Sequence, residues 1–334
     1  MKRARNLYNR IHTRENLAIA FNKAAKGKHD NREVVEFKNN FEESIGTMMI
    51  RLIEKKPDIG HYHFFTVRDP KVRSICAASF PERVLHHAIM NVCEPVLESY
   101  SIFDSYACRP GKGLHRALSR ARGFSKKYPW FLKMDIRKYF DSIDHRIMMG
   151  LLSRRFKDKD VLNLFRQLLG TYHTKRGKGM PIGNLISQHL ANFYLGPLDR
   201  RIKEARRIKG YLRYMDDFII FAENKAQLKD ELYDVIGFLG RVLELKLADK
   251  IQLNRCERGI PFLGFRVFPH KVLLSPASKR RFSKKFRKYE ENFEKGVWTE
   301  DDLARHMGPL IEFTKAAHAK GFRKRIFEKY GVLF

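Results

Sequence analysis

Residues Tyr211–Phe221 read Tyr-Leu-Arg-Tyr-Met-Asp-Asp-Phe-Ile-Ile-Phe and are the most informative segment of the sequence. Aromatic and β-branched residues flank Asp216 and Asp217 on both sides. This pattern predicts two strands joined by a tight turn that carries carboxylates at its tip. Carboxylates beside an apolar sheet are costly unless a cation neutralises them, and a divalent metal ion would do so. Asp is also a common turn residue, so the doublet alone leaves an ordinary acidic turn equally open.

The charge of the chain indicates the kind of partner it binds. Its 334 residues include 67 Lys and Arg against 37 Asp and Glu, a formal net charge of +30 that is spread along the whole chain. Such a field favours a polyanion, with nucleic acid as the first candidate and an anionic membrane surface as the alternative. No segment approaches the roughly eighteen apolar residues of a membrane span. The four cysteines form no CxxC pair, which disfavours a zinc site and favours a reducing cytoplasm.

A third acid stands at the end of another predicted strand, Trp130–Ile136, where Asp135 meets a loop. Asp144, further on, is predicted to cap the next helix instead. A cation-rich turn, Arg68–Arg73, separates two more predicted strands, His63–Val67 and Ser74–Ala78. Its Arg and Lys side chains could grip a triphosphate, although a solvated surface turn explains them as well.

Two glycine-rich loops invite a ligand-binding interpretation. Arg109–Gly113 contains Gly-Lys-Gly, but it lacks the earlier Gly and the following Ser or Thr of a Walker phosphate-binding loop, so that interpretation is rejected. It stays open as a basic loop near nucleic acid or a backbone turn. Thr174–Gln188 contains three glycines and a proline and leads into a helix, so its backbone could approach a nucleotide or nucleic acid closely.

Helical periodicity marks both ends of the chain. Apolar residues recur at three and four positions over Val34–Ile53, which predicts one helix with a core-facing stripe. Pro81 is predicted to open a later helix. Near the C-terminus, Ser275 precedes a proline and Thr299 forms a capping box with Asp302, so a small, basic helical unit is expected there.

Taken in chain order, these motifs resemble the palm of a reverse transcriptase, over a region from about Phe64 to the C-terminal helices. The ordered set consists of the Arg73 hairpin, the Arg109–Gly113 loop, Asp135 with Phe140, the Gly183 loop, the Tyr214–Asp217 box, Lys250, and Phe262–Phe265. The resemblance implies an α+β right-hand polymerase. Residues 1–125 would form the fingers with an N-terminal helical extension, residues 126–270 the palm with an antiparallel sheet and flanking helices, and residues 271–334 a helical thumb.

The resemblance also implies nucleotidyl transfer by two Mg²⁺ ions, for which Mn²⁺ could substitute. By resemblance, Asp135 and Asp216 would bridge both ions, and Asp217 would be the more peripheral acid. The backbone carbonyl of Ile136 would reach the nucleotide-bound ion.

Further roles carry over by the same resemblance. Lys71 and Arg73 would clamp the triphosphate of an incoming deoxynucleotide, and Lys250 would lie near the leaving pyrophosphate. Phe140 matches the bulky residue that rejects a ribose 2′-hydroxyl. Tyr214 and Met215 belong to the primer-side hairpin.

The loop at Ile182, Gly183, Ser187 and Gln188 departs from the group II intron enzymes, which usually carry Gln-Gly, three residues and Ser-Pro. It resembles the reverse transcriptases of diversity-generating retroelements. Because the loop would pack under the nascent base pair, a loss of ~1–3 kcal/mol in discrimination would raise errors roughly five- to two-hundred-fold.

Membership in that family implies a cytoplasmic enzyme of a bacterium, archaeon or phage. It would copy a template-repeat RNA into cDNA with errors at template adenines, for mutagenic retrohoming and targeted gene diversification. Its partners would be the template RNA, the RNA/DNA heteroduplex, deoxynucleotides and a small, basic, oligomeric accessory variability protein. A group II intron-type or retron-type reverse transcriptase and a catalytically dead nucleic-acid-binding scaffold are the alternatives. Phe140 argues against an RNA-dependent RNA polymerase.

Overall fold

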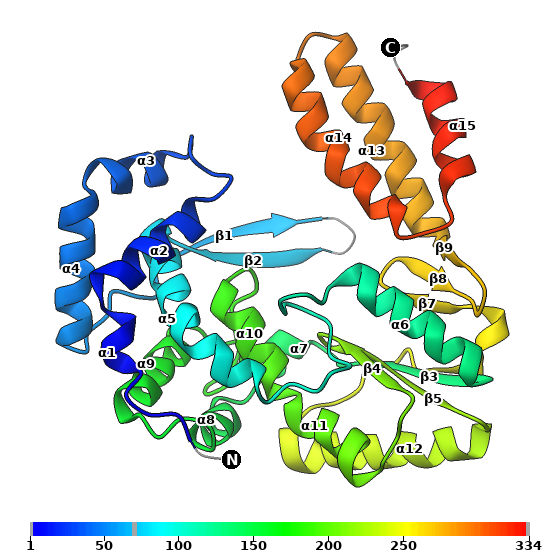
Figure 1. The fold of residues 1–334 in the computed structure, drawn as a ribbon, viewed down its shortest axis with the longest axis horizontal. Helices are drawn as coiled ribbons and strands as arrows, with labels where there is room; N and C mark the ends of the chain where they lie inside the picture. Colours follow the sequence, from blue (N-terminus) through cyan, green and yellow to red (C-terminus); the bar gives the residue numbers. More distant parts are fainter. Residues whose placement is uncertain (1–2, 69–71, 332–334) are drawn as a thin grey trace. The chain divides into compact units, whose positions relative to one another are not determined.

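The computed structural model describes residues 3–68 and 72–331, which form an α+β protein of helices and β-sheets (Figure 1). Lys71, a predicted triphosphate ligand, lies outside the described residues. The chain forms two compact units, each assembled from three separate segments. The first contains Met1–Cys108, Asp135–Arg207 and Asp234–Asp249, and the second contains Arg109–Met134, Ile208–Tyr233 and Lys250–Phe334. The boundaries of fingers, palm and thumb stay a prediction.

Helices dominate the N-terminal segment of the first unit. The short α1 (Tyr8–Ile11) is followed by α2 (Arg14–Ala25), whose cap Thr13 accepts a hydrogen bond from the N–H of Asn16. α2 packs against α5 (Phe80–Glu98), the most extensively buried helix of this segment. A proline in the first turn opens α5, as the sequence predicts.

The single helix predicted over Val34–Ile53 is in fact two helices, α3 (Arg32–Asn39) and α4 (Phe41–Ile53). The chain breaks at Asn40, which has non-helical dihedral angles of φ −109° and ψ 34°. Two asparagines in succession favour such a break, because their short amides compete for backbone hydrogen bonds. The prediction that this face packs in the core is wrong for Ile53, which is 58% exposed.

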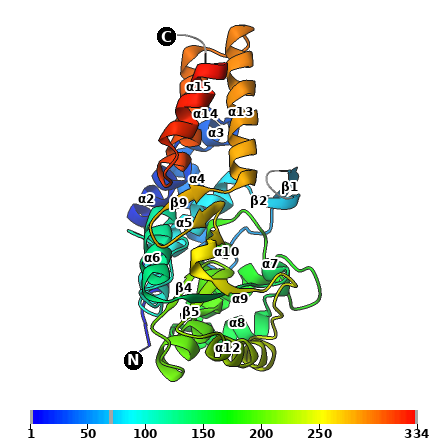
Figure 2. The ribbon, with the colours of Figure 1, turned by 90° about the vertical axis from the view of Figure 1, so that its right-hand side faces the viewer.

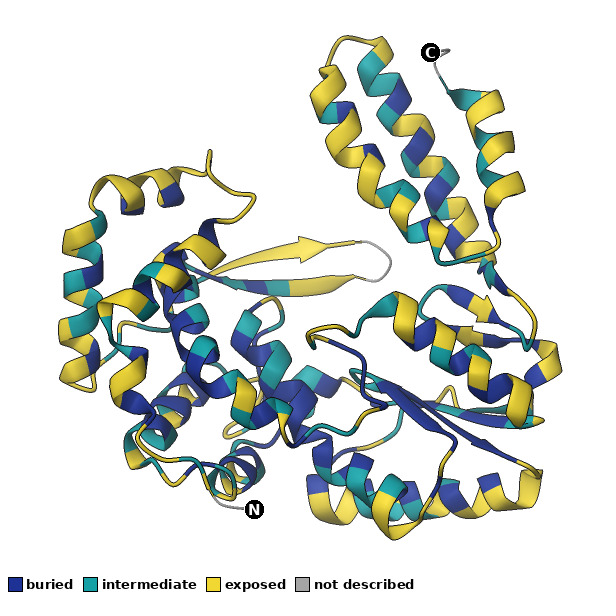
Figure 3. Ribbon diagram, viewed as in Figure 1, coloured by how far each residue is buried: buried dark blue, intermediate teal, exposed yellow. Residues whose placement is uncertain are grey.

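The two strands predicted around the cationic turn are confirmed as β1 (Tyr62–Val67) and β2 (Arg73–Ala78). They pair antiparallel, with Val67 opposite Arg73 at the end nearest the turn. Almost all of β1 is exposed, whereas the end of β2 is buried (Figure 3). The hairpin is therefore anchored through the second half of β2.

The rest of the first unit is mainly helical. Asp144 accepts a hydrogen bond from the N–H of Ile147 at 3.0 Å, which confirms its predicted role as a helix cap. α10 packs against α5 and is buried along most of its length. The helices here are α7 (Tyr139–Ser142), α8 (His145–Ser153), α9 (Lys159–Gly170), α10 (Leu185–Tyr194) and α11 (Gly196–Arg200), which continues into a π-helical turn at Arg201–Ala205.

A four-stranded sheet in the order β4-β5-β3-β6 is the centre of the second unit. β4 and β5 are buried along most of their length (Figure 3), because most of their residues are apolar on both faces. α6 (Leu114–Lys127) packs on β4, and α12 (Lys225–Phe238) follows β5 and ends in a π-helical turn at Leu239–Leu243. The strands are β3 (Trp130–Asp135), β4 (Tyr211–Tyr214), β5 (Asp217–Ala222) and β6 (Gln252–Arg255).

The C-terminal part of the second unit is a small sheet followed by the predicted helical bundle, seen side-on in Figure 2. Phe282, Phe286, Leu303 and Met307 form the bundle core. Both predicted caps are confirmed, at Ser275 and at the Thr299 capping box. A 3₁₀ turn at Cys256–Arg258 precedes the sheet of β7 (Ile260–Phe262), β8 (Phe265–Val267) and β9 (Val272–Leu274), and the bundle contains α13 (Pro276–Glu294), α14 (Glu300–Lys315) and α15 (Lys320–Tyr330).

Candidate active site

The acidic doublet lies on a two-residue β-hairpin, as the sequence predicts. β4 and β5 pair antiparallel with Tyr214 opposite Asp217, so Met215 and Asp216 form the connection. Met215 has a φ of +57°, in the left-handed region. Such a conformation costs a non-glycine residue roughly 1–3 kcal/mol and is concentrated at functional sites. The turn is therefore a strained platform for Asp216.

A buried arginine supports this turn from inside the sheet. Arg213 is 0% exposed, although it carries a full charge. Its Nη1 donates a hydrogen bond to the carbonyl oxygen of Met215 at 2.9 Å. A charge-assisted bond to a backbone acceptor contributes more than a neutral one, so Arg213 stabilises the unusual conformation of Met215. A charged residue inside an apolar strand was the sequence signal for this role, and it was missed.

Asp217 contacts a cation on the neighbouring strand. Its Oδ1 lies 2.7 Å from the Nζ of Lys133 on β3, and both side chains are largely shielded from solvent. β3 is the neighbour of β5 in the sheet, and it ends two residues later at Asp135. The ion pair therefore places positive charge beside the Asp217 carboxylate. The sequence did not indicate that Lys133 would have this role.

Asp135 and Ile136 begin the second of the three chain segments that form the first unit. An extended part of the third segment pairs with them like a β-strand. The carbonyl oxygen of Asp135 accepts a hydrogen bond from the N–H of Ala248 at 2.8 Å. Ile136 is buried and forms an isolated antiparallel bridge with Leu247. The backbone around the first predicted metal ligand is therefore fixed, while the carboxylate of Asp135 is only partly buried.

Carboxylate oxygens are the hard ligands that magnesium prefers, so the donor types of the three acids fit this ion. Asp216 and Asp217 belong to the second compact unit and Asp135 to the first. Within residues 3–68 and 72–331, no three His, Cys, Asp or Glu side chains are close enough together to hold a metal ion. The structure thus places Asp216 and Asp217 together on one hairpin, and their joint role with Asp135 stays a prediction.

The other predicted nucleotide contacts lie on separate elements. Arg73 is exposed at the first position of β2, and Lys250 is exposed just before β6. Phe140 is half-buried on α7, and its ring contacts Tyr139 edge-on at 5.7 Å between centroids. The Tyr139 hydroxyl in turn donates to the carbonyl oxygen of Ala191, which ties α7 to α10.

The Ile182–Gln188 loop is bonded directly to β2. The N–H of Cys76 donates to the carbonyl oxygen of Ile182 at 2.8 Å, and the N–H of Ala78 donates to Oδ1 of the buried Asn184 at 3.0 Å. Gly183 lies between these bonds with a φ of +118°. The loop therefore extends the β1–β2 hairpin, an arrangement that depends on pairing over about a hundred residues and that the sequence did not reveal.

The far end of the loop makes a different kind of contact. Ser187 is buried in the first turn of α10, and Gln188 is half-buried. The Oε1 of Gln188 accepts a hydrogen bond from the Cys108 thiol, whose sulfur lies 3.2 Å away. Burial raises the pKa of the Cys108 thiol, so it remains a protonated donor at neutral pH. A proline at position 188 would lose this contact.

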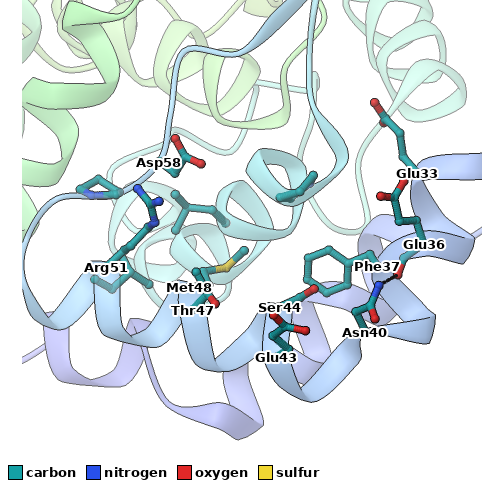
Figure 4. Close-up of a pocket in the computed structure, with 14 residues that line it drawn as sticks. Glu33, Glu36, Phe37, Asn40, Glu43, Ser44, Thr47, Met48, Arg51 and Asp58 are labelled. Carbon is teal, nitrogen blue, oxygen red and sulfur yellow. Dashed lines mark hydrogen bonds between the residues drawn. The ribbon is translucent and has the colours of Figure 1, made fainter.

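A separate cavity of about 530 Å³ lies among α3, α4 and the start of α5 (Figure 4). Glu33, Glu36, Glu43 and Asp58 line it, with Arg51 as the cation among them. An excess of carboxylates repels phosphate groups. The cavity contains none of the predicted site residues and is unsuited to nucleic acid.

The family model described as reverse transcriptase (RNA-dependent DNA polymerase) matches residues 53–267, well over half of the chain. The chain therefore belongs to the reverse transcriptase family. This match includes the sheet, the acidic hairpin and the Gly183 loop. None of the described helices is both long enough and apolar enough to cross a bilayer.

Curated relatives include intron-encoded proteins. The chain is similar to protein YkfC of Escherichia coli (strain K12), with 25% identity over 259 residues that cover 62% of this chain and 68% of YkfC. The group II intron-encoded protein LtrA of Lactococcus lactis subsp. cremoris is 29% identical over 143 residues, 41% of this chain and 24% of LtrA. Nuclear intron maturase 1, mitochondrial, of Arabidopsis thaliana is 29% identical over 150 residues, 44% of this chain and 20% of that protein. The chain thus spans about two thirds of YkfC and a quarter or less of the other two.

Solved structures of telomerase share the fold. Apo telomerase from Candida tropicalis superposes with a TM-score of 0.52 at 11% identity, over 87% of this chain and 64% of that one. Telomerase from Candida albicans, in complex with a fragment of telomeric RNA, gives 0.50 at 11% identity, over 83% of this chain and 57% of that one. At these identities the likeness shows the reverse transcriptase fold alone, an α+β polymerase fold as predicted.

Proposed function

We propose that this protein is an RNA-directed DNA polymerase that extends a primer on an RNA template. The observation that carries the proposal is the strained turn of Met215 and Asp216, stabilised by the buried Arg213, with Asp217 beside β3. Strain of this kind persists where the surrounding structure maintains it for a function. A two-residue hairpin calls for a positive φ at its first turn residue, which Gly, Asn or Asp usually supplies. The methionine at this position and the buried arginine that bonds to it are what set this turn apart from an ordinary acidic turn.

In the proposed reaction, the carboxylate oxygens of Asp135, Asp216 and Asp217 would hold two magnesium ions, and the carbonyl oxygen of Ile136 would be a further ligand. The ions, when bound, activate the primer 3′-hydroxyl and neutralise the leaving pyrophosphate. Arg213 keeps the Asp216 turn in register by its bond to the Met215 carbonyl. Lys133 maintains positive charge next to Asp217.

The residues around the acids bind and select the nucleotide. Arg73, together with Lys71, clamps the triphosphate, because guanidinium forks match phosphate oxygens. Lys250 lies on the side of the leaving pyrophosphate. Phe140 excludes a 2′-hydroxyl by its bulk, while the contact between Tyr139 and Ala191 fixes the helix that carries it. Tyr214 and Met215 present the primer end.

Primer extension tests this proposal directly. The full chain, an RNA template and a DNA primer are incubated with Mg²⁺ and either deoxynucleotides or ribonucleotides, and the products are separated by length. Synthesis with deoxynucleotides is expected, with loss of at least 1000-fold in Asp216→Asn, because a metal ligand is removed. RNA binding by that variant should be retained. Full synthesis by Asp216→Asn, or a dependence on ribonucleotides, would refute the assignment.

The finer proposal is a diversity-generating reverse transcriptase that makes errors at template adenines. It is supported by Ile182 and Gln188 in the loop that hydrogen-bonds to β2 and to Cys108. The proposed partners are a template-repeat RNA and a small, basic, oligomeric accessory protein, and the proposed setting is the cytoplasm of a bacterium, archaeon or phage-infected cell. Sequencing cDNA from wild type and from Ile182→Gln tests the loop, since an unchanged adenine error rate would contradict it.

A group II intron-type enzyme is the second candidate, because LtrA and an intron maturase are among the relatives. This candidate predicts no bias toward errors at template adenines. The same cDNA sequencing separates the two candidates. Errors concentrated at adenines support diversification, and uniformly rare errors support the intron-type enzyme.

A further inference from the structure

The second large cavity of the first unit, about 500 Å³ in volume, is lined by cations that no assigned role uses. Three stretches of chain form it, at residues 137–142, 174–178 and 244–246. They contribute Arg137, Lys138, Lys175, Lys178 and Lys246 against two carboxylates, Asp141 and Glu244. This volume is in the range of small-ligand sites in proteins, roughly 300–1,000 Å³.

The carboxylate of Glu244 is already committed to other partners. It pairs with Lys178 at 2.6 Å and with Arg146, outside the cavity, at 2.9 Å. Lys178 also lies 3.5 Å from Asp144. Within the described part of the chain, Arg137, Lys138, Lys175 and Lys246 make no ion pair. The cavity therefore offers four exposed positive charges against one remaining carboxylate, that of Asp141, which leaves a clear excess of positive charge.

The wall of the cavity is ordered by its own hydrogen bonds. The N–H of Arg137 donates to the carbonyl oxygen of Lys246 at 2.9 Å, and Thr174 Oγ1 donates to the carbonyl oxygen of Asp141 at 2.8 Å. The N–H of Lys178 donates to the carbonyl oxygen of Lys175 at 2.8 Å, which closes a tight turn. These bonds fix the backbone positions from which the cationic side chains extend before any ligand arrives.

Two residues on this wall have strained backbones. Lys138 has a φ of +45° and Glu244 a φ of +52°, and neither is a glycine. Each left-handed residue costs roughly 1–3 kcal/mol, a cost that persists where the local geometry is used. Backbone strain thus occurs in two of the three stretches that line the cavity, and it marks this site independently of its charge.

We propose that this cavity is a binding site for an oligophosphate anion, either inorganic pyrophosphate or the triphosphate tail of a free nucleoside triphosphate. Four cations around one cavity match a ligand with several phosphate groups. An RNA backbone is instead followed by a stripe of cations along a surface, with aromatic side chains for its bases. The cavity among α3, α4 and the start of α5 is lined mainly by carboxylates, so it is not expected to bind such an anion.

The position of the cavity suggests why such a ligand would be present. Arg137 follows Asp135 by two residues, so their Cα atoms are at most about 7 Å apart. The choice of these two ligands rests on the proposed function, since DNA synthesis consumes nucleoside triphosphates and releases pyrophosphate. Binding itself requires no template or primer, and can be measured separately.

The test compares two double variants by isothermal titration calorimetry, with the full chain and without divalent metal. Lys175→Ala with Lys246→Ala removes two charges from the cavity. Arg154→Ala with Arg176→Ala is the matched control, because it removes two charges from exposed positions that do not line the cavity. The probes are inorganic pyrophosphate, inorganic tripolyphosphate, a deoxynucleoside triphosphate and a short RNA without terminal phosphates. Circular dichroism establishes that both variants fold.

The cavity variant should weaken tripolyphosphate binding by roughly 10-fold or more, and the control by less than about 2-fold. Nucleotide binding as tight as tripolyphosphate binding would identify the triphosphate tail, and preferential pyrophosphate binding would identify the leaving group. Equal effects of both variants, or no effect, would overturn the proposal. An equal loss of RNA binding in the cavity variant would overturn it in favour of a nucleic-acid groove. If the protein synthesises no DNA, the calorimetric result still stands, so the two proposals fail separately.

Discussion

Replacing Gly183 by alanine tests the connection between the Ile182–Gln188 loop and β2. A Cβ at this position would lie 2.7 Å from Cγ2 of Ile75 and 3.4 Å from the carbonyl oxygen of Cys76. Ile75 is β-branched and lies in a strand, so its methyl group has few alternative rotamers. The backbone φ of +118° adds conformational strain for any L side chain. Gly183→Ala should therefore destabilise the protein through two separate terms.

The magnitude follows from these two terms. Backbone strain contributes roughly 1–3 kcal/mol, and overpacking against Ile75 contributes about 1–3 kcal/mol more. The expected loss in free energy of unfolding is thus about 2–6 kcal/mol. Gly177→Ala is the matched control, because Gly177 also has a positive φ, of +73°, but a Cβ there meets nothing within 4 Å. Its loss should be about 1 kcal/mol, from strain alone.

Urea denaturation followed by circular dichroism measures both losses. Ile75→Ala removes the clashing methyl group, so in a double-mutant cycle it should recover about 1 kcal/mol or more in the Gly183→Ala background. Primer extension and cDNA sequencing on the folded variant would show whether the displaced loop also changes errors at adenines. The reasoning is refuted if Gly183→Ala and Gly177→Ala cost the same within about 0.5 kcal/mol, or if the cycle shows no coupling.

Three further predictions concern other elements. Arg213→Met keeps the aliphatic stem but removes the donor to Met215, so unfolding free energy should fall by about 2–3 kcal/mol and DNA synthesis should fall more than RNA binding. Burial raises the pKa of Asp158, but four backbone N–H donors together lower it below its usual range; they belong to Leu7, Tyr8, Asp160 and Val161. Asp158→Asn should therefore lower the free energy of unfolding by about 1–3 kcal/mol at pH 7. Thr299→Ala should cost about 1 kcal/mol by removing the capping box of α14.

Each of these has a control. Arg213→Lys keeps the charge without the planar fork and should lie between Arg213→Met and wild type. Because the folded pKa of Asp158 is depressed, its stabilisation is present above the unfolded pKa near ~4 and is lost as pH falls through the folded value. The difference between wild type and Asp158→Asn should therefore shrink below about pH 4, and a constant difference would contradict this account. Asp30→Asn, at an exposed position, should show no such change. Thr299→Ser should retain the cap of α14, and a loss equal to that of alanine would argue against it.

The sequence was sufficient to predict the elements that depend on interactions between residues close together in the chain. The strands around Asp216, the cap at Asp144 and the capping box at Thr299 depend on residues a few positions apart, and the structure confirms all three. The exception is Asn40, where periodicity alone continued a helix that the asparagine pair interrupts. Periodicity reports which residues share a face, and it does not report whether the backbone between them is continuous.

Contacts across long stretches of chain were out of reach of the sequence. The ion pair of Lys133 with Asp217 and the hydrogen bond of Ala78 to Asn184 each join residues about eighty to a hundred positions apart. Neither pair has a characteristic spacing, because strand order and loop docking decide it. The basic cavity at Arg137 and Lys246 was missed for the same reason, since its cations come from three stretches that resemble ordinary surface charge.

The order of strands in the β4-β5-β3-β6 sheet has a consequence for synthesis on the ribosome. β3 is made first, yet it lies between β5 and β6, which are translated later. β6 begins about 120 residues after β3 ends, a delay of roughly 6–24 s at about 5–20 residues per second. During that interval the apolar Trp130–Met134 segment has no complete sheet to join. The nascent chain should therefore depend on chaperones. A ribosome-bound fragment that ends before Gln252 should be bound by nascent-chain chaperones more strongly than the finished protein.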